Sequence, residues 1–334
     1  MMTVAALFGA IYIGSMALCV GALRERQPNS TASTEAAPLV PSLIGTLRNK
    51  PFMGLLPAWI MDMAAYTMLG TMLPFFVEYV IVPSSVPCVT RDPSKEDEAW
   101  CKADIWLGFG LVMLIGAQIM FMPMWLCLTR KLGKFRTWLL FNLFNSVTNA
   151  LFVFASTGDP KMTIVFAVIN GIPAGAQFLT DSIVADTIAY DEFLTGFRSE
   201  GRFTIFATFI PKIVSIPAQA IPLALLAFVG FKPPENGVPQ PQPDSVKTFI
   251  RLVFFVIPSI LSIGSFFIKR KFPIQTEHHL AQINEGIAIH AQGLPAVDPL
   301  TGRTVTLFKA SKSELKSTFD LDNFFPRQLR RMAQ

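Results

Sequence analysis

The sequence predicts an all-α membrane protein with about seven transmembrane helices, and three observations support this. Hydrophobic residues make up 51% of the 334 residues and charged residues only 15%, whereas soluble domains carry about 25% charged residues. The apolar residues form long blocks, as membrane spans require. Polar, cation-bearing segments separate these blocks. The net charge of +5 is modest and forms no basic face, so we expect no nucleic-acid partner.

Each apolar block has about 18 residues or more, enough to cross a hydrocarbon core of ~30 Å. The blocks must be helical, because lipid offers no partners to backbone N–H and C=O groups. The second block is long enough to tilt, or to bend at Pro57 or Pro74. The predicted spans are Thr3–Leu23, Phe52–Val82, Ile105–Leu128, Trp138–Ala155, Met162–Ile183, Phe203–Val229 and Phe249–Ile268.

The orientation follows from the distribution of Lys and Arg, which are enriched in cytosolic loops. One set of loops is richer in these residues, with cations at positions 24, 26, 48, 50, 130, 131, 134, 136, 198 and 202, and three more at 269–271. We therefore expect the N-terminus outside and the C-terminal tail in the cytosol, with the plasma membrane as the location.

The segments between spans differ in composition. Residues 24–50 include a Ser-, Thr-, Ala- and Pro-rich stretch that reads as a flexible linker. Thr276–Ala291 fits an amphipathic helix, and we expect residues 293–334 to be partly disordered. Cys88 and Cys101 share an outer loop. A disulfide there would add about 3 kcal/mol in the chain-entropy model, and two free thiols are the alternative.

Two cytosolic motifs indicate the family. The segment Pro123–Arg136 has a turn at Gly133 flanked by four cations; it resembles the loop signature of the major facilitator superfamily, although a simple positive-inside loop is the alternative. The segment Ala185–Gly201 reads Ala-Asp-Thr-Ile-Ala-Tyr-Asp-Glu-Phe-Leu-Thr-Gly-Phe-Arg-Ser-Glu-Gly. It resembles the motif of the glycoside–pentoside–hexuronide cation symporters, which include melibiose permease and the sodium-dependent lysophospholipid transporters.

This resemblance covers roughly Pro51–Ile283 and implies the C-terminal six spans of a twelve-span major-facilitator fold. Residues 1–23 would then be the sixth family span, residues 24–50 the central linker, residues 51–268 the transporter half and residues 269–334 the tail. The family implies symport of a sugar, a glycoside or a lysophospholipid with Na⁺ or H⁺. In the family the cation is held by aspartates of the N-terminal half, so we expect a partial transporter with no cofactor of its own.

The partners expected are membrane lipid, a small-molecule substrate and a separate N-terminal half. The alternative function is a non-transporting regulatory or degenerate half-transporter. Catalysis is not indicated, because no Ser/His/Asp set, phosphate loop or metal cluster is suitably placed. His278, His279 and His290 do not match the spacing of a strong metal site.

Lys212 is the principal functional candidate. It lies about ten residues into an apolar span, where a charge costs roughly 2.5–3.5 kcal/mol on insertion scales. The resemblance assigns it to coupling of ion and substrate, since a lysine occupies the matching helix of the family. A lysine that snorkels to the membrane surface is the alternative.

The acidic motif predicts ion pairs at the cytosolic end. We expect Asp186, Asp191 and Glu192 to pair with Arg198, Arg202 or the Arg130–Arg136 loop and to hold a gate shut; a substrate contact or solvated charge is the alternative. The predicted gate comprises Asp186, Tyr190, Asp191, Glu192, Arg198, Glu200, Arg130, Lys131 and Lys134.

Polar residues inside spans face an interior or a cavity. The candidate cavity-lining residues are Asp62, Tyr66, Asn142, Asn145, Asn149 and Asp181. The three asparagines lie on one stripe of a helix, and hydrogen bonding between helices explains them equally well.

Overall fold

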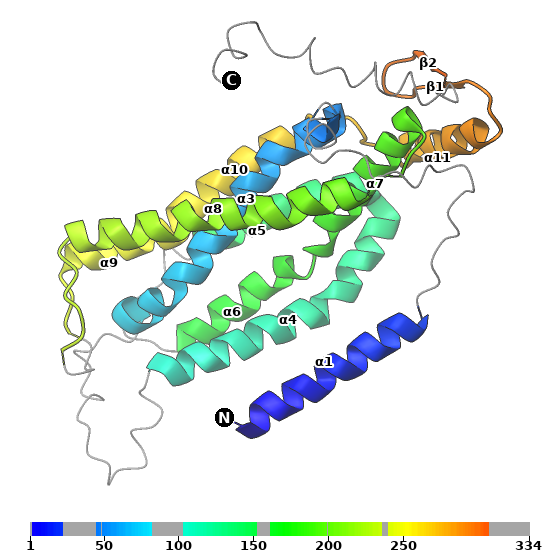
Figure 1. Cartoon of the computed structure of the whole chain (residues 1–334). Helices are drawn as coiled ribbons and strands as arrows, with labels where there is room; N and C mark the ends of the chain where they lie inside the picture. The colour runs from blue at the N-terminus through cyan, green and yellow to red at the C-terminus, as the bar shows by residue number, and fades with distance from the viewer. Residues whose placement is uncertain are drawn as a thin grey trace, which may run out of the picture. The chain divides into compact units, whose positions relative to one another are not determined.

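The computed structural model describes residues 2–22, 45–47, 49–81, 103–151, 161–198, 200–235 and 240–306. Helices account for most of them (Figure 1). The chain divides into two compact units, Met1–Ala37 and Pro38–Gln334. In the first unit α1 (Met2–Ala22) forms where the first span is predicted. From Tyr12 to Ala22 its side chains are exposed.

The second unit is a helical bundle. Its helices are α3 (Lys50–Phe76) with the π-helical turn η1 (Val77–Ile81), α4 (Ala103–Leu132), α5 (Lys134–Leu151), α6 (Lys161–Ala174), α7 (Phe178–Thr195), α8 (Glu200–Phe228), α9 (Asp244–Arg251) with the π-helical turn η5 (Leu252–Val256), α10 (Ile257–Lys269) and α11 (Glu277–Ala291). Two short strands follow, β1 (Ala296–Val297) and β2 (Thr304–Val305).

Five stretches of the described chain are long and apolar enough to cross a membrane: Lys50–Ile81, Ile105–Leu132, Lys161–Thr195, Glu200–Phe228 and Asp244–Lys269. They coincide with five of the seven predicted spans. A helix also forms at the predicted span Trp138–Ala155, where α5 is described to Leu151. It is not among the five stretches, because asparagines and hydroxyl residues lower its apolarity.

Local signals set the ends of the helices near the acidic motif. Asn49 caps α3, and its side-chain oxygen accepts a hydrogen bond from the N–H of Phe52 at 3.2 Å. Gly133 separates α4 from α5 with φ of 82°, and Gly196 ends α7 with φ of 74°. Side chains other than glycine rarely adopt this left-handed backbone. Both turns therefore fix where the neighbouring charged residues leave the bundle.

The predicted fifth span is made of two helices. Between α6 and α7 the chain makes hydrogen bonds three residues apart, from Ala176 N to Pro173 O at 2.9 Å and from Gln177 N to Ala174 O at 3.2 Å. These tight turns interrupt the regular α-helical ladder. The acidic segment after the break remains helical up to Thr195, so its carboxylates project from a rigid element.

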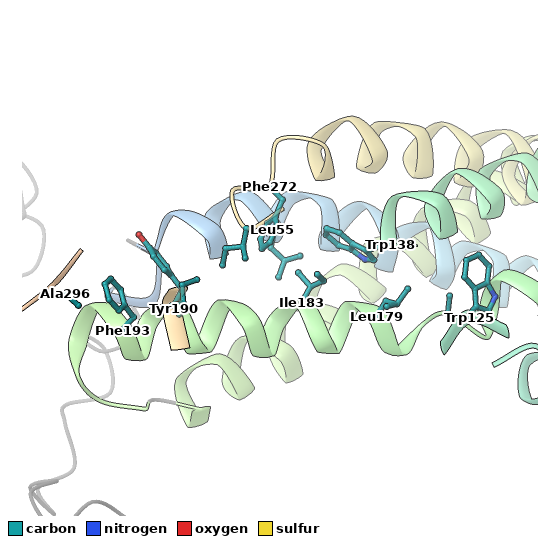
Figure 2. Packing of buried hydrophobic residues seen from close by; sticks show 12 residues of the cluster. Leu55, Trp125, Trp138, Leu179, Ile183, Tyr190, Phe193, Phe272 and Ala296 are labelled. Carbon is teal, nitrogen blue, oxygen red and sulfur yellow. The ribbon is translucent and has the colours of Figure 1, made fainter. Parts of the chain in front are cut away.

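Two buried clusters form the core of the bundle. One surrounds η1 and η5 and is rich in phenylalanine, with Phe76 stacked on Phe254 at 4.8 Å between ring centroids. The other follows α7 from Leu179 to Phe193 and continues to Ala296 in the tail (Figure 2). The tail is therefore part of the same packed core as the helices.

Residues 293–306, the described part of the tail that was expected to be partly disordered, are ordered. β1 and β2 pair in antiparallel register, with Ala296 opposite Val305. Asp298 and Gly302 close the turn, since Gly302 N donates to Asp298 O at 2.8 Å. The predicted amphipathic helix Thr276–Ala291 is confirmed: α11 is capped by the Thr276 side chain, and its Ile283 is fully buried.

Candidate functional site

Lys212 lies midway along α8. It is the thirteenth residue of a helix of 29, about 18 Å from the helix start at a rise of 1.5 Å per residue. Its side chain is exposed, and within the described chain it forms no ion pair. Snorkelling over such a distance is difficult for one lysine side chain. The position therefore favours a charge that faces an aqueous space or a partner.

A hollow of about 350 Å³ lies beside Lys212, lined also by Thr204, Ile205, Thr208 and Phe209. Thr204, Thr208 and Lys212 are four residues apart, so they follow one face of α8 with a drift of about 40° per step. The face thus presents two hydroxyls and one ammonium in a row. Both hydroxyls donate to the carbonyl four residues earlier, at 2.9 Å and 2.7 Å. The ammonium can therefore donate to an anionic solute, and the hydroxyl oxygens can accept from a hydroxylated one.

The predicted pairing of the acidic motif is confirmed. Lys134 Nζ lies 2.9 Å from Asp186 Oδ1, which joins the α4–α5 turn to α7. Arg202 Nη2 lies 3.2 Å from Asp191 Oδ2 and joins α8 to α7. Asn49 Nδ2 also donates to Asp191 at 3.3 Å, from the start of α3. Three elements therefore hold the carboxyl end of α7, while the gating role stays a prediction.

The third pair is more exposed. Arg198 Nη1 lies 3.3 Å from Glu192 Oε2, and Arg198 Nε donates to Glu200 Oε1 at 2.5 Å. The hydrogen bond to Glu200 is the largest cause that raises the pKa of Arg198, against a smaller effect of burial. The guanidinium therefore remains charged and ties the loop after α7 to the first turn of α8.

Two predicted gate cations have no ion pair within the described residues. Arg130 and Lys131 are exposed in the last turn of α4. They border a hollow of about 300 Å³ with Gly133, Lys134 and Glu277. Their ammonium and guanidinium groups are thus available to partners that the structure does not contain.

Tyr190, also predicted in the gate, has a partner in the tail. Its hydroxyl donates to Asp298 Oδ2 at 3.0 Å, and both residues are only 3% exposed. Sequence reasoning missed Asp298 because it placed this segment in an unstructured tail. The available signal was the turn sequence Asp298-Pro-Leu-Thr-Gly302 between two short β-branched stretches.

Lys269 is a second charged residue that sequence reasoning missed. Its side chain is completely buried, and Nζ lies 2.6 Å from Asp62 Oδ2. It also donates to Asn142 Oδ1 and lies 4.5 Å from the centre of the Trp138 ring. These contacts join α3, α5 and α10. The position of Asp62 inside a span could have suggested a buried cation, because intramembrane charges are usually paired.

The candidate cavity residues separate into two groups. Tyr66 and Asp181 are exposed, and Asp62 retains 22% side-chain exposure. Asn142 and Asn149 are 1–2% exposed, so both lie inside the packed bundle.

The two buried asparagines differ in their contacts. Asn142 donates to Ser262 O of α10 at 2.6 Å. This bond joins two helices, as the alternative interpretation of the asparagine stripe predicted. The Asn149 amide has no hydrogen-bond partner among the described residues. Asn145 is half-buried. The predicted bridge between Cys88 and Cys101 lies outside the described residues.

Comparison with known proteins agrees with this architecture. The family "MFS/sugar transport protein" matches residues 98–276. A protein of Escherichia coli strain K12, whose name describes a sulfoquinovose importer, is 23% identical over 272 residues, covering 81% of this chain and 53% of the relative. An uncharacterized symporter of Synechocystis is 24% identical over 75% of this chain and 43% of its own length.

A protein of Salmonella typhimurium, whose name describes a 2,3-dihydroxypropane-1-sulfonate exporter, is 24% identical over 78% of this chain and 51% of its own length. The chain spans about half the length of the curated relatives it matches. With five apolar stretches of spanning length, it is an integral membrane protein of a transporter class rather than an enzyme. The chain belongs to the MFS/sugar transport family, as the motif at Ala185–Gly201 and the lysine of the following helix predicted.

Proposed function

We propose that residues 51–268 form the C-terminal half of a cation-coupled symporter. In this assignment, residues 1–23 are the sixth family span, residues 24–50 are a cytosolic linker and residues 269–334 are a cytosolic tail. The plasma membrane is the proposed location. The observation that carries the proposal is the exposed Lys212 at the middle of α8, without an ion pair in the described chain.

The site is completed by a second half. Substrate sites of this class lie near the bilayer midplane between two structural halves. An exposed ammonium at that depth is stable only if it faces water, a substrate or a carboxylate. We therefore propose that the face of α8 with Thr204, Thr208 and Lys212 lines the space between the halves. Acidic residues of the second half would hold the coupling cation, Na⁺ or H⁺.

The proposed substrate is a small hydroxylated solute with an anionic group. The relatives named for sulfoquinovose and 2,3-dihydroxypropane-1-sulfonate support this class, because both names describe hydroxylated sulfonates. An ammonium group can neutralise a sulfonate and donate to its oxygens, and the threonine oxygens can accept hydrogen bonds from substrate hydroxyls. The same chemistry would also accept a phosphate, so a lysophospholipid is a second probe.

The test is uptake by the full-length protein in proteoliposomes under Na⁺ or H⁺ gradients. Sulfoquinovose, 2,3-dihydroxypropane-1-sulfonate, an uncharged sugar and a lysophosphatidylcholine serve as separate probes. We expect gradient-dependent accumulation of a sulfonate and no accumulation without the gradient. Uptake of the uncharged sugar or the lysolipid alone would contradict the substrate class. Uptake of none would favour a non-transporting protein.

Lys212 variants test the residue assigned to coupling. Lys212→Ala should reach the membrane at least as well as wild type, because it removes an insertion cost of roughly 2.5–3.5 kcal/mol. Its uptake should nevertheless collapse. Lys212→Arg should restore uptake only in part, because a planar guanidinium replaces a compact ammonium. Lys232→Ala is the matched control, since Lys232 is exposed beyond the end of the same helix. If uptake per molecule of Lys212→Ala in the membrane equals that of wild type, the coupling role of Lys212 is contradicted.

A further inference from the structure

The tail packs directly on the carboxyl end of α7. We use the name tail module for α11, β1 and β2, residues 277–305. Figure 1 shows these elements gathered at the end of α7, and Figure 2 shows Tyr190, Phe193 and Ala296 together at one end of the buried row. The contact thus lies on the same helix end that carries the ion-paired carboxylates.

The apolar part of the contact is tight. Phe193 is fully buried. The His290 ring of α11 stacks on it at 5.0 Å between centroids with an 18° angle. A Cβ added to Gly286 would lie 2.4 Å from Cε2 of Phe193, so only glycine lets α11 approach this closely. The shape of the two helices is therefore matched at this point.

The polar part of the contact is centred on a hydrogen bond to Asp298. Within the hairpin, Asp298 Oδ1 accepts from Leu300 N at 2.9 Å and Oδ2 accepts from Thr301 Oγ1 at 2.5 Å. These two hydrogen bonds within the hairpin orient the Asp298 carboxylate independently of α7. The Tyr190 hydroxyl then donates to Oδ2 at 3.0 Å from outside the hairpin. This bond reports whether the tail module and α7 are in contact.

The contact shares a face of α7 with an ion pair. Asp186, Tyr190 and Phe193 stand at positions i, i+4 and i+7, which lie on one side of a helix. Lys134 holds Asp186 on this side, and the tail module covers the next two turns. The start of α11 also borders the α4–α5 turn, where Glu277 lines the same hollow as Lys134. Movement of the end of α7 away from Lys134 would therefore strain the contact between α7 and the tail module.

We propose that the tail module is a latch of the gate and that Asp298 positions Tyr190 so that α7 keeps Asp186 and Asp191 paired. The biological role of this contact rests on the proposed transport function, but the contact itself can be measured without transport. One buried hydrogen bond corresponds to a change of about 2- to 12-fold in an equilibrium. Loss of the Tyr190 hydroxyl should raise the population of the unpaired arrangement of α7 by that factor.

The experiment measures amide hydrogen exchange of Tyr190→Phe, in the full-length protein in lipid nanodiscs. Phenylalanine keeps the ring and removes only the hydroxyl. Exchange of the peptide covering Asp186–Thr195 should rise about 2- to 12-fold, while the bundle melts at an unchanged temperature. Thr301→Val is the matched control: it removes the other hydroxyl donor to Asp298 and should affect residues 296–305 first. Gly286→Ala should reproduce the effect of Tyr190→Phe by displacing α11 from Phe193.

Wild-type exchange of α7 in both Tyr190→Phe and Gly286→Ala would overturn the latch. An equal rise of exchange in every helix, together with a lower melting temperature, would also overturn it, because that pattern is general destabilisation. Absence of uptake for all solutes would contradict the proposed function alone, since exchange is measured without substrate.

Discussion

Asp62→Asn should destabilise the bundle more than Lys269→Met, although each removes one partner of the same ion pair. Lys269 is fully buried, whereas 22% of the Asp62 side chain is exposed. After Asp62→Asn the ammonium retains Asn142 and the Trp138 and Phe141 rings as favourable contacts, but no carboxylate within the described residues. After Lys269→Met water can still reach the carboxylate. The burial of the residue left behind therefore decides the cost.

The magnitudes follow from buried pairs in other proteins. Removing one partner of a buried pair typically costs about 3–5 kcal/mol, whereas replacing both partners by apolar residues of similar volume is often harmless. The double variant therefore combines Asp62→Leu with Lys269→Met. We expect about 3–5 kcal/mol for Asp62→Asn and about 1–3 kcal/mol for Lys269→Met. The double variant should lie within about 1 kcal/mol of wild type.

The assay is equilibrium unfolding in mixed micelles with increasing sodium dodecyl sulfate, followed by tryptophan fluorescence. The control pair is Asp244 with Lys247, at 3.6 Å on the exposed first turn of α9. Neutralising either control residue should change little, because solvent screens the pair. The reasoning fails if Asp62→Asn is no worse than Lys269→Met. It also fails if the double variant loses as much stability as both single variants added together.

Two further predictions concern helix packing and topology. Gly171→Ala should cost about 1–3 kcal/mol of stability, because its Cβ would lie 2.5 Å from Cβ of Ala117 on the packed helix α4. Gly264→Ala should cost less, because its Cβ would meet the flexible end of Met61 at 2.4 Å. Thermal unfolding in detergent compares the two variants. Asn29, in the sequon Asn-Ser-Thr of the proposed cytosolic linker, should carry no glycan in secretory membranes; an endoglycosidase-sensitive mass shift that is lost in Asn29→Gln would show the opposite orientation.

Much of the helical framework could be predicted because apolar length decides it. A block of about 18 apolar residues has few alternatives to a membrane helix. The pairing of Asp186 and Asp191 with Lys134 and Arg202 was also within reach, because positive loops flank the acidic helix end. The individual partners required the structure, since several cations were equally suitable by sequence.

Lys269 shows why the remainder could not be predicted. It is the first of three consecutive cations, Lys269-Arg270-Lys271, which together resemble a solvated positive tail. Only the antiparallel packing of α10 on α3 turns the first of them inward, as the hydrogen bond from Ser265 Oγ to Ala58 O at 3.2 Å shows. Asp298 is similar, because the turn is visible in the sequence but its contact with Tyr190 depends on tertiary packing.

The break between α6 and α7 divides one predicted membrane span into two helices that are held by different contacts. α6 is fixed to α4 by close contact, because a Cβ at Gly171 would lie 2.7 Å from the Leu114 carbonyl oxygen. α7 is instead held at its far end by charges and by the tail. The two helices of this span are therefore held by different contacts, so substitutions at the α4–α6 contact and at the carboxyl end of α7 should act on separate parts of the same span.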